Sequence, residues 1–213
     1  MNNKISTGDF LDLSDFKFAD IFENTTLPWE VITKISDYVK AKLTEDNPPA
    51  NFTKNNNVLI GKGTIIEEGA VIKDGAIIGE NCTIGSAVLI RGNCIIGDNV
   101  QLGHGIELKH SLILNNSAIA HLNYVGDSVV GNDVNISGGA IVANLRLDKS
   151  EISVNIAGEK IKTGLEKFGA VIGDGSTVGV NAVLNPGTVL GKNCVIYPLT
   201  SVRGFHNANE IIK

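Results

Sequence analysis

The stretch VLIGKGTIIEEGAVIKDGAIIGENCTIGSAVLI (58–90) carries an isoleucine at every sixth position from Ile60 to Ile90. Large aliphatic residues keep this period as far as Leu114, and Ala120 falls on the next position. An α-helix would repeat about every 3.6 residues and a simple strand about every 2, so a longer period predicts short straight segments joined by turns. We therefore predict an all-β chain built as a stack of coils.

The pattern resembles the hexapeptide repeat of left-handed parallel β-helix proteins. With three hexads to a coil, this chain would form roughly seven coils. The resemblance supplies the handedness, since most parallel crossovers are right-handed. It also implies a homotrimer with sites between subunits.

The period fails after Ala120 and resumes at Val130. We interpret residues 121–127 as an insertion into the scaffold, and expect function at this interruption. A second irregular stretch, about 145–170, predicts a short hairpin or arm that leaves the scaffold. The period returns at Ile172 and ends at Val202, so we place the β-helix domain at 58–204 and a short polar tail at 205–213.

Residues 1–50 lack the repeat. Pro28 sits where it favours the first turn of a helix, and an apolar stripe follows from Val31 to Leu43. The first coil of a solenoid has unpaired backbone groups and an uncovered core at its open end, so this end must be capped. We predict that 1–50 is an N-terminal helical cap over the first coil.

Composition sets broad limits on function. The chain has 213 residues, a net charge of −5 and 5% aromatic residues. The negative charge argues against nucleic acid as a partner. Without an apolar leader or a run of about 18 apolar residues, we expect neither secretion nor a membrane partner.

The three cysteines, Cys82, Cys94 and Cys194, each stand two residues before a position of the period. Free cysteine behaves there as a small apolar residue, so we expect inert core thiols, with a disulfide or a metal ligand as the alternatives. The expected localisation is cytoplasmic. No trio of histidines has the spacing of a metal site, so we expect no metal.

Lys73, Arg91 and Lys109 are spaced 18 residues apart. With three hexads per coil they would stack into one column, where like charges repel. A bound anion would compensate that repulsion, and arginine suits bidentate phosphate contact. The alternative is a solvated basic edge neutralised by nearby carboxylates, and the spacing alone does not decide between them.

His121 opens the interruption. Imidazole titrates near neutral pH and so suits a general base, although a lone histidine is more often structural or simply exposed. We expect Asn144 to lie one coil above it, within reach.

The segments KHS (109–111), AHLNYVGDS (120–128), GNDVN (131–135) and ANLR (143–146) together resemble one family. It is the acetyltransferase domain of the bifunctional glucosamine-1-phosphate N-acetyltransferase/N-acetylglucosamine-1-phosphate uridylyltransferases. The archaeal-type sugar-1-phosphate nucleotidylyltransferases carry this domain at their C-terminus. The resemblance covers about residues 58–203.

This resemblance implies roles for individual residues. It makes His121 the catalytic base and Asn144 an amide that positions the acetyl group. The implied substrate contacts are Arg91, Lys109, Tyr124, Asn135 and, as the nearest match to a family lysine, Lys149. The implied acetyl-CoA contacts are the backbone of Gly138 and the groove positions Val180 and Pro198, where the side chains depart from the family.

The first 57 residues carry no Gly-rich nucleotidyltransferase signature and are too few for a nucleotide-binding α/β domain, so we expect no uridylyl transfer. The main hypothesis is acetyl-CoA-dependent N-acetylation of a hexosamine 1-phosphate, most simply glucosamine 1-phosphate. Galactosamine 1-phosphate or a nucleotide-linked amino sugar are alternative acceptors. The rival from another class is a non-catalytic sugar-phosphate-binding or scaffold trimer that works with a separate nucleotidyltransferase.

Overall fold

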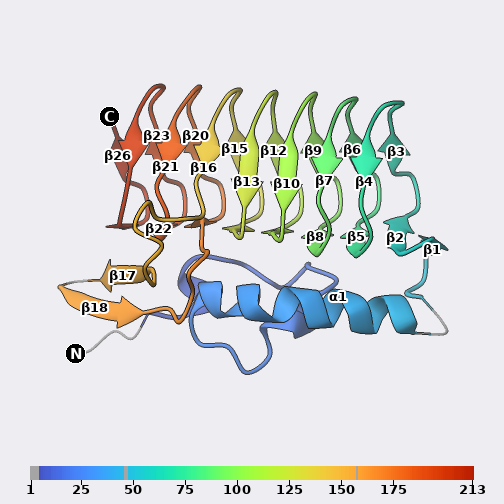
Figure 1. Cartoon of the computed structure of the whole chain (residues 1–213), viewed down its shortest axis with the longest axis horizontal. Helices are drawn as coiled ribbons and strands as arrows, with labels where there is room; N and C mark the ends of the chain where they lie inside the picture. Colours follow the sequence, from blue (N-terminus) through green and yellow to red (C-terminus); the bar gives the residue numbers. More distant parts are fainter. Residues whose placement is uncertain (1–4, 46–47, 157) are drawn as a thin grey trace.

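The computed structural model describes residues 5–45, 48–156 and 158–213. Three sheets run the length of a triangular solenoid, and a layer made by the N-terminal segment lies beside one of them (Figure 1). Within the described residues, 26 short strands make up these sheets and one hairpin. The predicted class, a left-handed parallel β-helix of hexapeptide repeats with a short helical segment before it, is confirmed.

Each coil places one strand on each of three faces, which we name A, B and C. Face A holds, in spatial order, β1 (Phe52–Asn55), β2 (Val58–Gly61), β5 (Ala76–Ile78), β8 (Cys94–Ile96), β11 (Leu112–Ile113), β14 (Val129–Val130), β19 (Ala170–Ile172), β22 (Thr188–Leu190) and β25 (Phe205–His206). Here β1 pairs antiparallel with β2, whereas the others pair in parallel.

Face B holds β3 (Ile65–Ile66), β6 (Thr83–Ile84), β9 (Gln101–Leu102), β12 (Ala118–Ile119), β15 (Asn135–Ile136), β20 (Thr177–Val178), β23 (Val195–Ile196) and β26 (Ile211–Ile212). Face C holds β4 (Val71–Ile72), β7 (Leu89–Ile90), β10 (Glu107–Lys109), β13 (Tyr124–Gly126), β16 (Ile141–Val142), β21 (Val183–Leu184) and β24 (Ser201–Val202). Because β25 and β26 pair with the preceding coil, residues 205–212 continue the solenoid and are not the separate tail that we predicted.

The strand registers correct our interpretation of the interruption. Ile78 pairs with Ile96 at a spacing of 18 residues, but Ile96 pairs with Ile113 at 17, and Val125 pairs with Val142 at 17. Two coils are therefore one residue short, and 121–127 is no insertion, because β13 continues face C in register with β10. The missing residues are at the corner between β10 and β11 and at the corner between β13 and β14.

Backbone geometry shows how the short corners are made. The regular corner after Arg91 uses two left-handed residues, Gly92 (φ 94°) and Asn93 (φ 50°). Each short corner uses one, His110 (φ 46°) or Asp127 (φ 47°). Among non-glycine residues, Asn, Asp and His adopt the left-handed conformation most often, so His110 and Asp127 can occupy the left-handed position that glycine or asparagine occupies at full-length corners.

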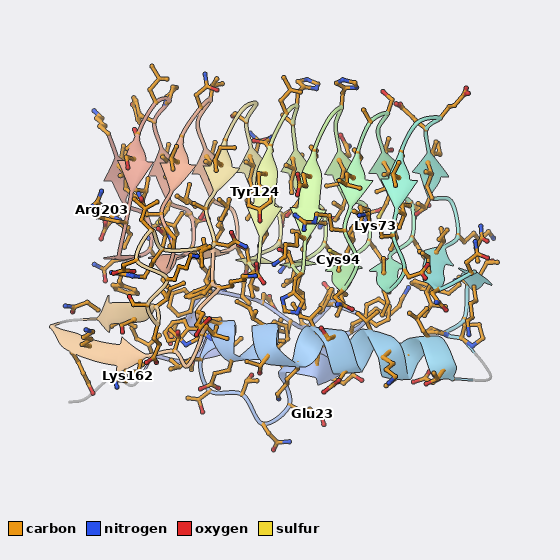
Figure 2. All side chains as sticks on the ribbon, viewed as in Figure 1. Glu23, Lys73, Cys94, Tyr124, Lys162 and Arg203 are labelled. Carbon is orange, nitrogen blue, oxygen red and sulfur yellow. The ribbon has the colours of Figure 1, made fainter. Side chains whose placement is uncertain are left out.

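The N-terminal layer lies along face A rather than over the first coil, which corrects the predicted cap. It consists of the 3-10 helices η1 (Thr7–Asp9), η2 (Ala19–Phe22) and η3 (Pro28–Lys34), followed by α1 (Ile35–Thr44). Figure 2 shows the side chains that fill the space between α1 and the solenoid. Trp29, Phe10 and Phe18 form one buried cluster there with outward residues of face A, which are Leu59, Ile77, Ile95, Leu112, Val129, Val171 and Val189.

The arm between β16 and β19 contains an antiparallel hairpin of β17 (Ser153–Ile156) and β18 (Glu159–Lys162). Ile152 and Val154 are buried in the same cluster as the N-terminal layer. The arm and the N-terminal layer together cover face A and leave faces B and C to other contacts.

The solenoid interior is aliphatic and includes Cys82, Cys94 and Cys194, all free and buried. Burial raises the pKa of the Cys94 thiol to about 12. These are unreactive core positions. Among the helices of the described residues, none has the length and hydrophobicity needed to cross a membrane.

Candidate active site on face C

Face C is bounded by two corners of the solenoid. The B–C corner precedes each strand of face C, and the C–A corner follows it. Ile72 pairs with Ile90, and Ile90 pairs with Leu108, so Lys73, Arg91 and Lys109 stack on successive coils at the C–A corner. The spacing of 18 residues predicts this column.

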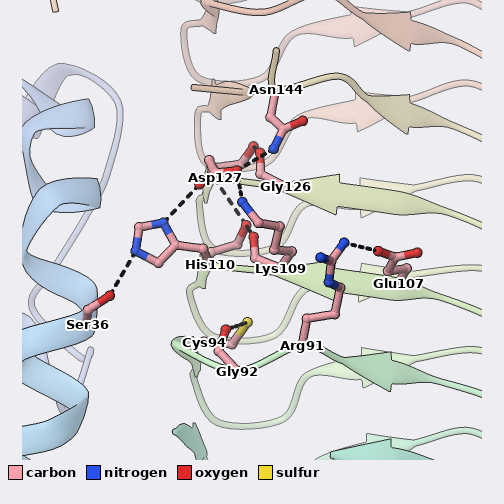
Figure 3. A network of polar contacts seen from close by, with 12 residues as sticks. Ser36, Arg91, Gly92, Cys94, Glu107, Lys109, His110, Gly126, Asp127 and Asn144 are labelled. Carbon is pink, nitrogen blue, oxygen red and sulfur yellow. Dashed lines mark hydrogen bonds and ion pairs between the residues drawn. The ribbon is translucent and has the colours of Figure 1, made fainter. Parts of the chain in front are cut away.

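Two of the stacked cations are paired with carboxylates, as the alternative interpretation of the column requires. Arg91 Nη1 lies 2.8 Å from Glu107 Oε1, and Lys109 Nζ lies 2.7 Å from Asp127 Oδ2 (Figure 3). The guanidinium has five N–H donors and the ammonium three, so both retain donors for a further anion. The column is thus neutralised in part and still able to bind phosphate.

Asp127 is the centre of the polar network. Its side chain is only 6% exposed. Its Oδ1 lies 3.0 Å from His110 Nδ1, and its Oδ2 accepts hydrogen bonds from Lys109 and from Nδ2 of Asn144. Burial raises the pKa of this carboxyl, but the hydrogen bonds from His110, Lys109 and Asn144 outweigh burial and hold the pKa below its ordinary value. The group is a buried, fully partnered carboxylate.

Tyr124 lies on face C beside this network. It pairs with Glu107 on the coil before and with Ile141 on the coil after. A methyl group on Gly126 would stand 2.8 Å from Cζ of Tyr124, so the ring folds closely over this glycine. Burial, then the charges of Asp127 and Glu107, raise the pKa of the phenol, which keeps it a neutral donor.

His121 is exposed at the B–C corner, on the opposite edge of face C from Lys109. Backbone hydrogen bonds link it to the coils on either side, with Leu122 N–H donating to His104 C=O and Gly139 N–H donating to His121 C=O. The same ladder continues with Asn181 N–H to Gly138 C=O and Leu199 N–H to Val180 C=O. These bonds align His121, Gly138, Val180 and Pro198 in one column.

This column corrects the expected place of Asn144. Gly138, not Asn144, lies one coil above His121, while Asn144 lies one coil above Asp127 at the C–A corner. The error follows from treating 121–127 as an insertion. His121 and Asn144 therefore stand at opposite edges of face C within one chain.

The structure does not bring two other predicted contacts to this face. Asn135 is exposed on face B, where it pairs with Ala118 and Thr177. Lys149 is exposed in the arm, with its N–H bonded to the carbonyl of Arg146.

Glu107, His110 and Asp127 were missed by sequence reasoning. The available signal was the spacing of 17 between His110 and Asp127, which equals the shortened coil and stacks both at one corner. Throughout residues 5–45, 48–156 and 158–213, no group of three or more His, Cys, Asp or Glu side chains could hold a metal ion.

Comparisons with known proteins agree with this architecture. Residues 75–168 match the GMPPB C-terminal domain, and residues 55–86 and 169–204 match the bacterial transferase hexapeptide repeat. A bifunctional sugar-1-phosphate nucleotidylyltransferase/acetyltransferase of Sulfurisphaera tokodaii is 41% identical over 80 residues, which is 38% of this chain and 20% of that protein. The bifunctional protein GlmU of Methanococcus vannielii is 48% identical over 66 residues, 31% of this chain and 16% of that protein.

The chain thus spans about a fifth or less of the length of these relatives. The solved structure of a mutant of the N-acyltransferase AntD from Bacillus cereus, in complex with dTDP and coenzyme A, is 16% identical at a TM-score of 0.34, over 72% of this chain and 81% of that chain. That likeness is too low to carry a functional argument. The resemblance inferred from the sequence is confirmed by these matches: the chain is similar to a GMPPB C-terminal domain over residues 75–168, to bacterial transferase hexapeptide repeats on either side of it, and to bifunctional nucleotidylyltransferase/acetyltransferases over part of its length.

Proposed function

We propose that this protein transfers an acetyl group from acetyl-CoA to the amine of a hexosamine 1-phosphate, with glucosamine 1-phosphate as the first candidate. The observation that carries the proposal is the division of chemistry across face C. Cations with spare donors stand at one edge, and a histidine aligned with the predicted coenzyme positions stands at the other. The names of the relatives above support the same activity.

The acceptor would lie across face C with its phosphate at the C–A corner. Arg91 and Lys109 would bind the phosphate oxygens with the donors that their carboxylate partners leave free. Tyr124, beside them, would donate to the sugar phosphate. The amine would then point towards the B–C corner and His121.

In the reaction His121 takes a proton from the acceptor ammonium. The free amine attacks the thioester carbonyl, the new C–N bond forms, and the C–S bond breaks to release coenzyme A as the thiolate. The nitrogen loses a second proton as the amide forms, and the thiolate takes up one of the two protons, so the products are the N-acetyl sugar phosphate, coenzyme A thiol and one proton in solution. Gly139 N–H is already bonded to the carbonyl of His121, which leaves the N–H of Gly138 as the candidate donor to the oxyanion.

The site also needs a second copy of the chain in this proposal. Asn135 is on face B, so it could contact an acceptor on face C only from a neighbouring subunit. A homotrimer, common among hexapeptide-repeat proteins, would bring face B of one copy against face C of the next. The pantetheine arm would lie in that seam along Val180 and Pro198.

The test measures coenzyme A release with acetyl-CoA and glucosamine 1-phosphate. His121→Ala should lower kcat by about 10²–10⁴-fold, the usual contribution of a general base. His104→Ala is the matched control, since His104 is an exposed histidine one coil away on the same corner. Equal turnover by wild type and His121→Ala would remove His121 from the role of base.

The acceptor and the rival function are decided by two further measurements. A panel with galactosamine 1-phosphate and nucleotide-linked amino sugars tests the acceptor, because the cations demand an anion without specifying the sugar. Calorimetry with acetyl-CoA tests the scaffold alternative. Sugar-phosphate binding without acetyl-CoA binding would favour a non-catalytic trimer that works with a separate nucleotidyltransferase.

A further inference from the structure

We infer that Asp127 is a positioning residue for the acceptor, which fixes Asn144 as a hydrogen-bond acceptor and Lys109 as a phosphate donor. This inference rests on the proposed function. Asp127 is 6% exposed and accepts from three side chains, of which Lys109 and His110 lie on the coil before it and Asn144 lies on the coil after it. Its carboxylate therefore links Lys109, which the proposal assigns to the phosphate, to Asn144, which stands at the same C–A corner.

Hydrogen-bond valence fixes the orientation of the Asn144 amide. An ionised carboxylate can only accept, so the amide must turn its NH2 group towards Asp127. Its carbonyl oxygen then faces away from the network, as Figure 3 shows for Asn144. A hexosamine presents hydroxyl and amine N–H donors, and the carbonyl of Asn144 is the group that would accept from one of them.

Asp127 also fixes the direction of the Lys109 side chain. A lysine side chain has a flexible four-carbon stem and is poorly ordered when the ammonium group has no partner. One N–H of Lys109 is held by Asp127 at 2.7 Å, which anchors the ammonium over face C while two donors stay available. Anchoring before binding removes part of the ordering cost that the phosphate would otherwise have to offset.

The carboxylate is itself braced from the other side. His110 Nδ1 contacts Oδ1 of Asp127, and His110 Nε2 lies 3.3 Å from Oγ of Ser36 on α1 (Figure 3). The N-terminal layer thus reaches the acceptor site through Ser36 and His110. This gives the layer a role in positioning the substrate besides covering face A.

The test compares wild type, Asp127→Asn and Asp133→Asn. Asp133 is an exposed aspartate at the next corner of the solenoid and is the matched control. Glucosamine 1-phosphate binding is measured by calorimetry without acetyl-CoA, and turnover is measured with both substrates. Since a hydrogen bond to a charged group contributes about 1.5–3 kcal/mol, Asp127→Asn should weaken sugar-phosphate binding by roughly 10–150-fold.

Two readouts separate positioning from a general structural effect. In Asp127→Asn the KM for acetyl-CoA should stay at the wild-type value while that for glucosamine 1-phosphate rises. With glucosamine, which lacks the phosphate, the loss caused by Asp127→Asn should be smaller, because Lys109 no longer contributes. Equal losses for all substrates would overturn the inference, as would wild-type binding by folded Asp127→Asn.

If Asp127→Asn does not fold, His110→Asn and Ser36→Ala take its place. Each should cause a smaller rise in the KM for glucosamine 1-phosphate and leave the KM for acetyl-CoA unchanged. An unchanged KM for glucosamine 1-phosphate would contradict the inference. The outcome also distinguishes this inference from the proposed function. If wild type binds glucosamine 1-phosphate but never acetylates it, the proposed function fails, and a loss of that binding in Asp127→Asn still supports the role of Asp127. If wild type acetylates and Asp127→Asn does so equally well, only this inference fails.

Discussion

Gly126→Ala should disable the acceptor site with little effect on folding. The added methyl group would stand 2.8 Å from Cζ of Tyr124 and 2.9 Å from Nδ2 of Asn144, whereas ordinary contact begins at 3.4 Å. The Tyr124 ring must therefore move by about 0.6 Å at Cζ and by more at its hydroxyl. A displacement on the order of 1 Å in a positioned group can cost about 10²-fold in rate, so we expect kcat/KM for glucosamine 1-phosphate to fall by about 10²-fold.

Stability should change far less. Gly126 is outside the left-handed region of φ, so alanine can adopt its backbone. Tyr124 is half-buried and can swing towards solvent, which keeps the cost at or below the about 1–3 kcal/mol typical of overpacking. Thermal unfolding measures this loss of stability. Gly8→Ala is the control, because the nearest atom to its added methyl group is 3.9 Å away.

A double variant identifies the cause. If the loss arises from the displaced hydroxyl, Gly126→Ala combined with Tyr124→Phe should be no worse than Tyr124→Phe alone. Steady-state kinetics of the four proteins complete the cycle. Wild-type kcat/KM in folded Gly126→Ala would refute the placement of Tyr124 in the site, and additive losses would refute the coupling.

Three further perturbations test other parts of the structure. Trp29 is 1% exposed and lies between the N-terminal layer and face A. Trp29→Ala should therefore lower the free energy of unfolding, measured in urea, by about 3–5 kcal/mol. A loss below about 1 kcal/mol would show that the layer is not tightly packed. Glu107→Gln should free Arg91 and tighten glucosamine 1-phosphate binding several-fold in calorimetry with the melting temperature unchanged, whereas weaker binding would mean that Glu107 orients the guanidinium. Because the pKa of Asp127 is lowered by folding, its stabilisation is present above the ordinary carboxyl value near 3.8 and is lost as pH falls through the folded value. The melting temperatures of wild type and Asp127→Asn should therefore converge as pH falls below the ordinary carboxyl value, and a constant gap would contradict this.

The solenoid could be predicted because its period is a local property of the sequence. The isoleucines at every sixth position, such as Ile78, Ile84 and Ile90, pack into the solenoid interior, so counting alone finds the coil. The short coils escaped this count because Leu114 and Ala120 are apolar and appear to keep the period, while Ile113 and Ile119 in fact face inward. Where two adjacent apolar residues both fit the pattern, only the strand pairing shows which of them faces inward.

The sequence does indicate which face the N-terminal layer covers, but the indication is not in the six-residue period. Strands of face A carry two apolar residues in a row, such as Ile95 with Ile96 and Val129 with Val130, and both residues are buried. The outward positions of face A are apolar in every strand from β2 to β22, whereas those of faces B and C mix polar residues such as Gln101 and Glu107 with exposed apolar ones such as Val183. A strand that is apolar on both sides must be covered on both, so the layer belongs on face A.

The site itself could be predicted in part for the same reason. The cations share one face at a fixed spacing, which arithmetic reveals, but Asp127 follows a glycine after a strand and resembles an ordinary turn residue. Its partners come from positions 17 residues apart along the coil, and that spacing is invisible until the coil length is known. Tertiary register, not local propensity, assembles this carboxylate network.

The short corners explain why polar chemistry collects at this edge. Two buried hydroxyls complete the hydrogen-bond ladder at the short corners, as Ser117 and Ser176 do at full-length ones. Ser128 N–H donates to Oγ of Ser111, and Ser128 Oγ in turn donates to Gly126 C=O and accepts from Ala170 N–H. His110 and Asp127 can place their side chains against each other beside Lys109, so the departure from the repeat supplies the functional groups that the repeat alone could not hold.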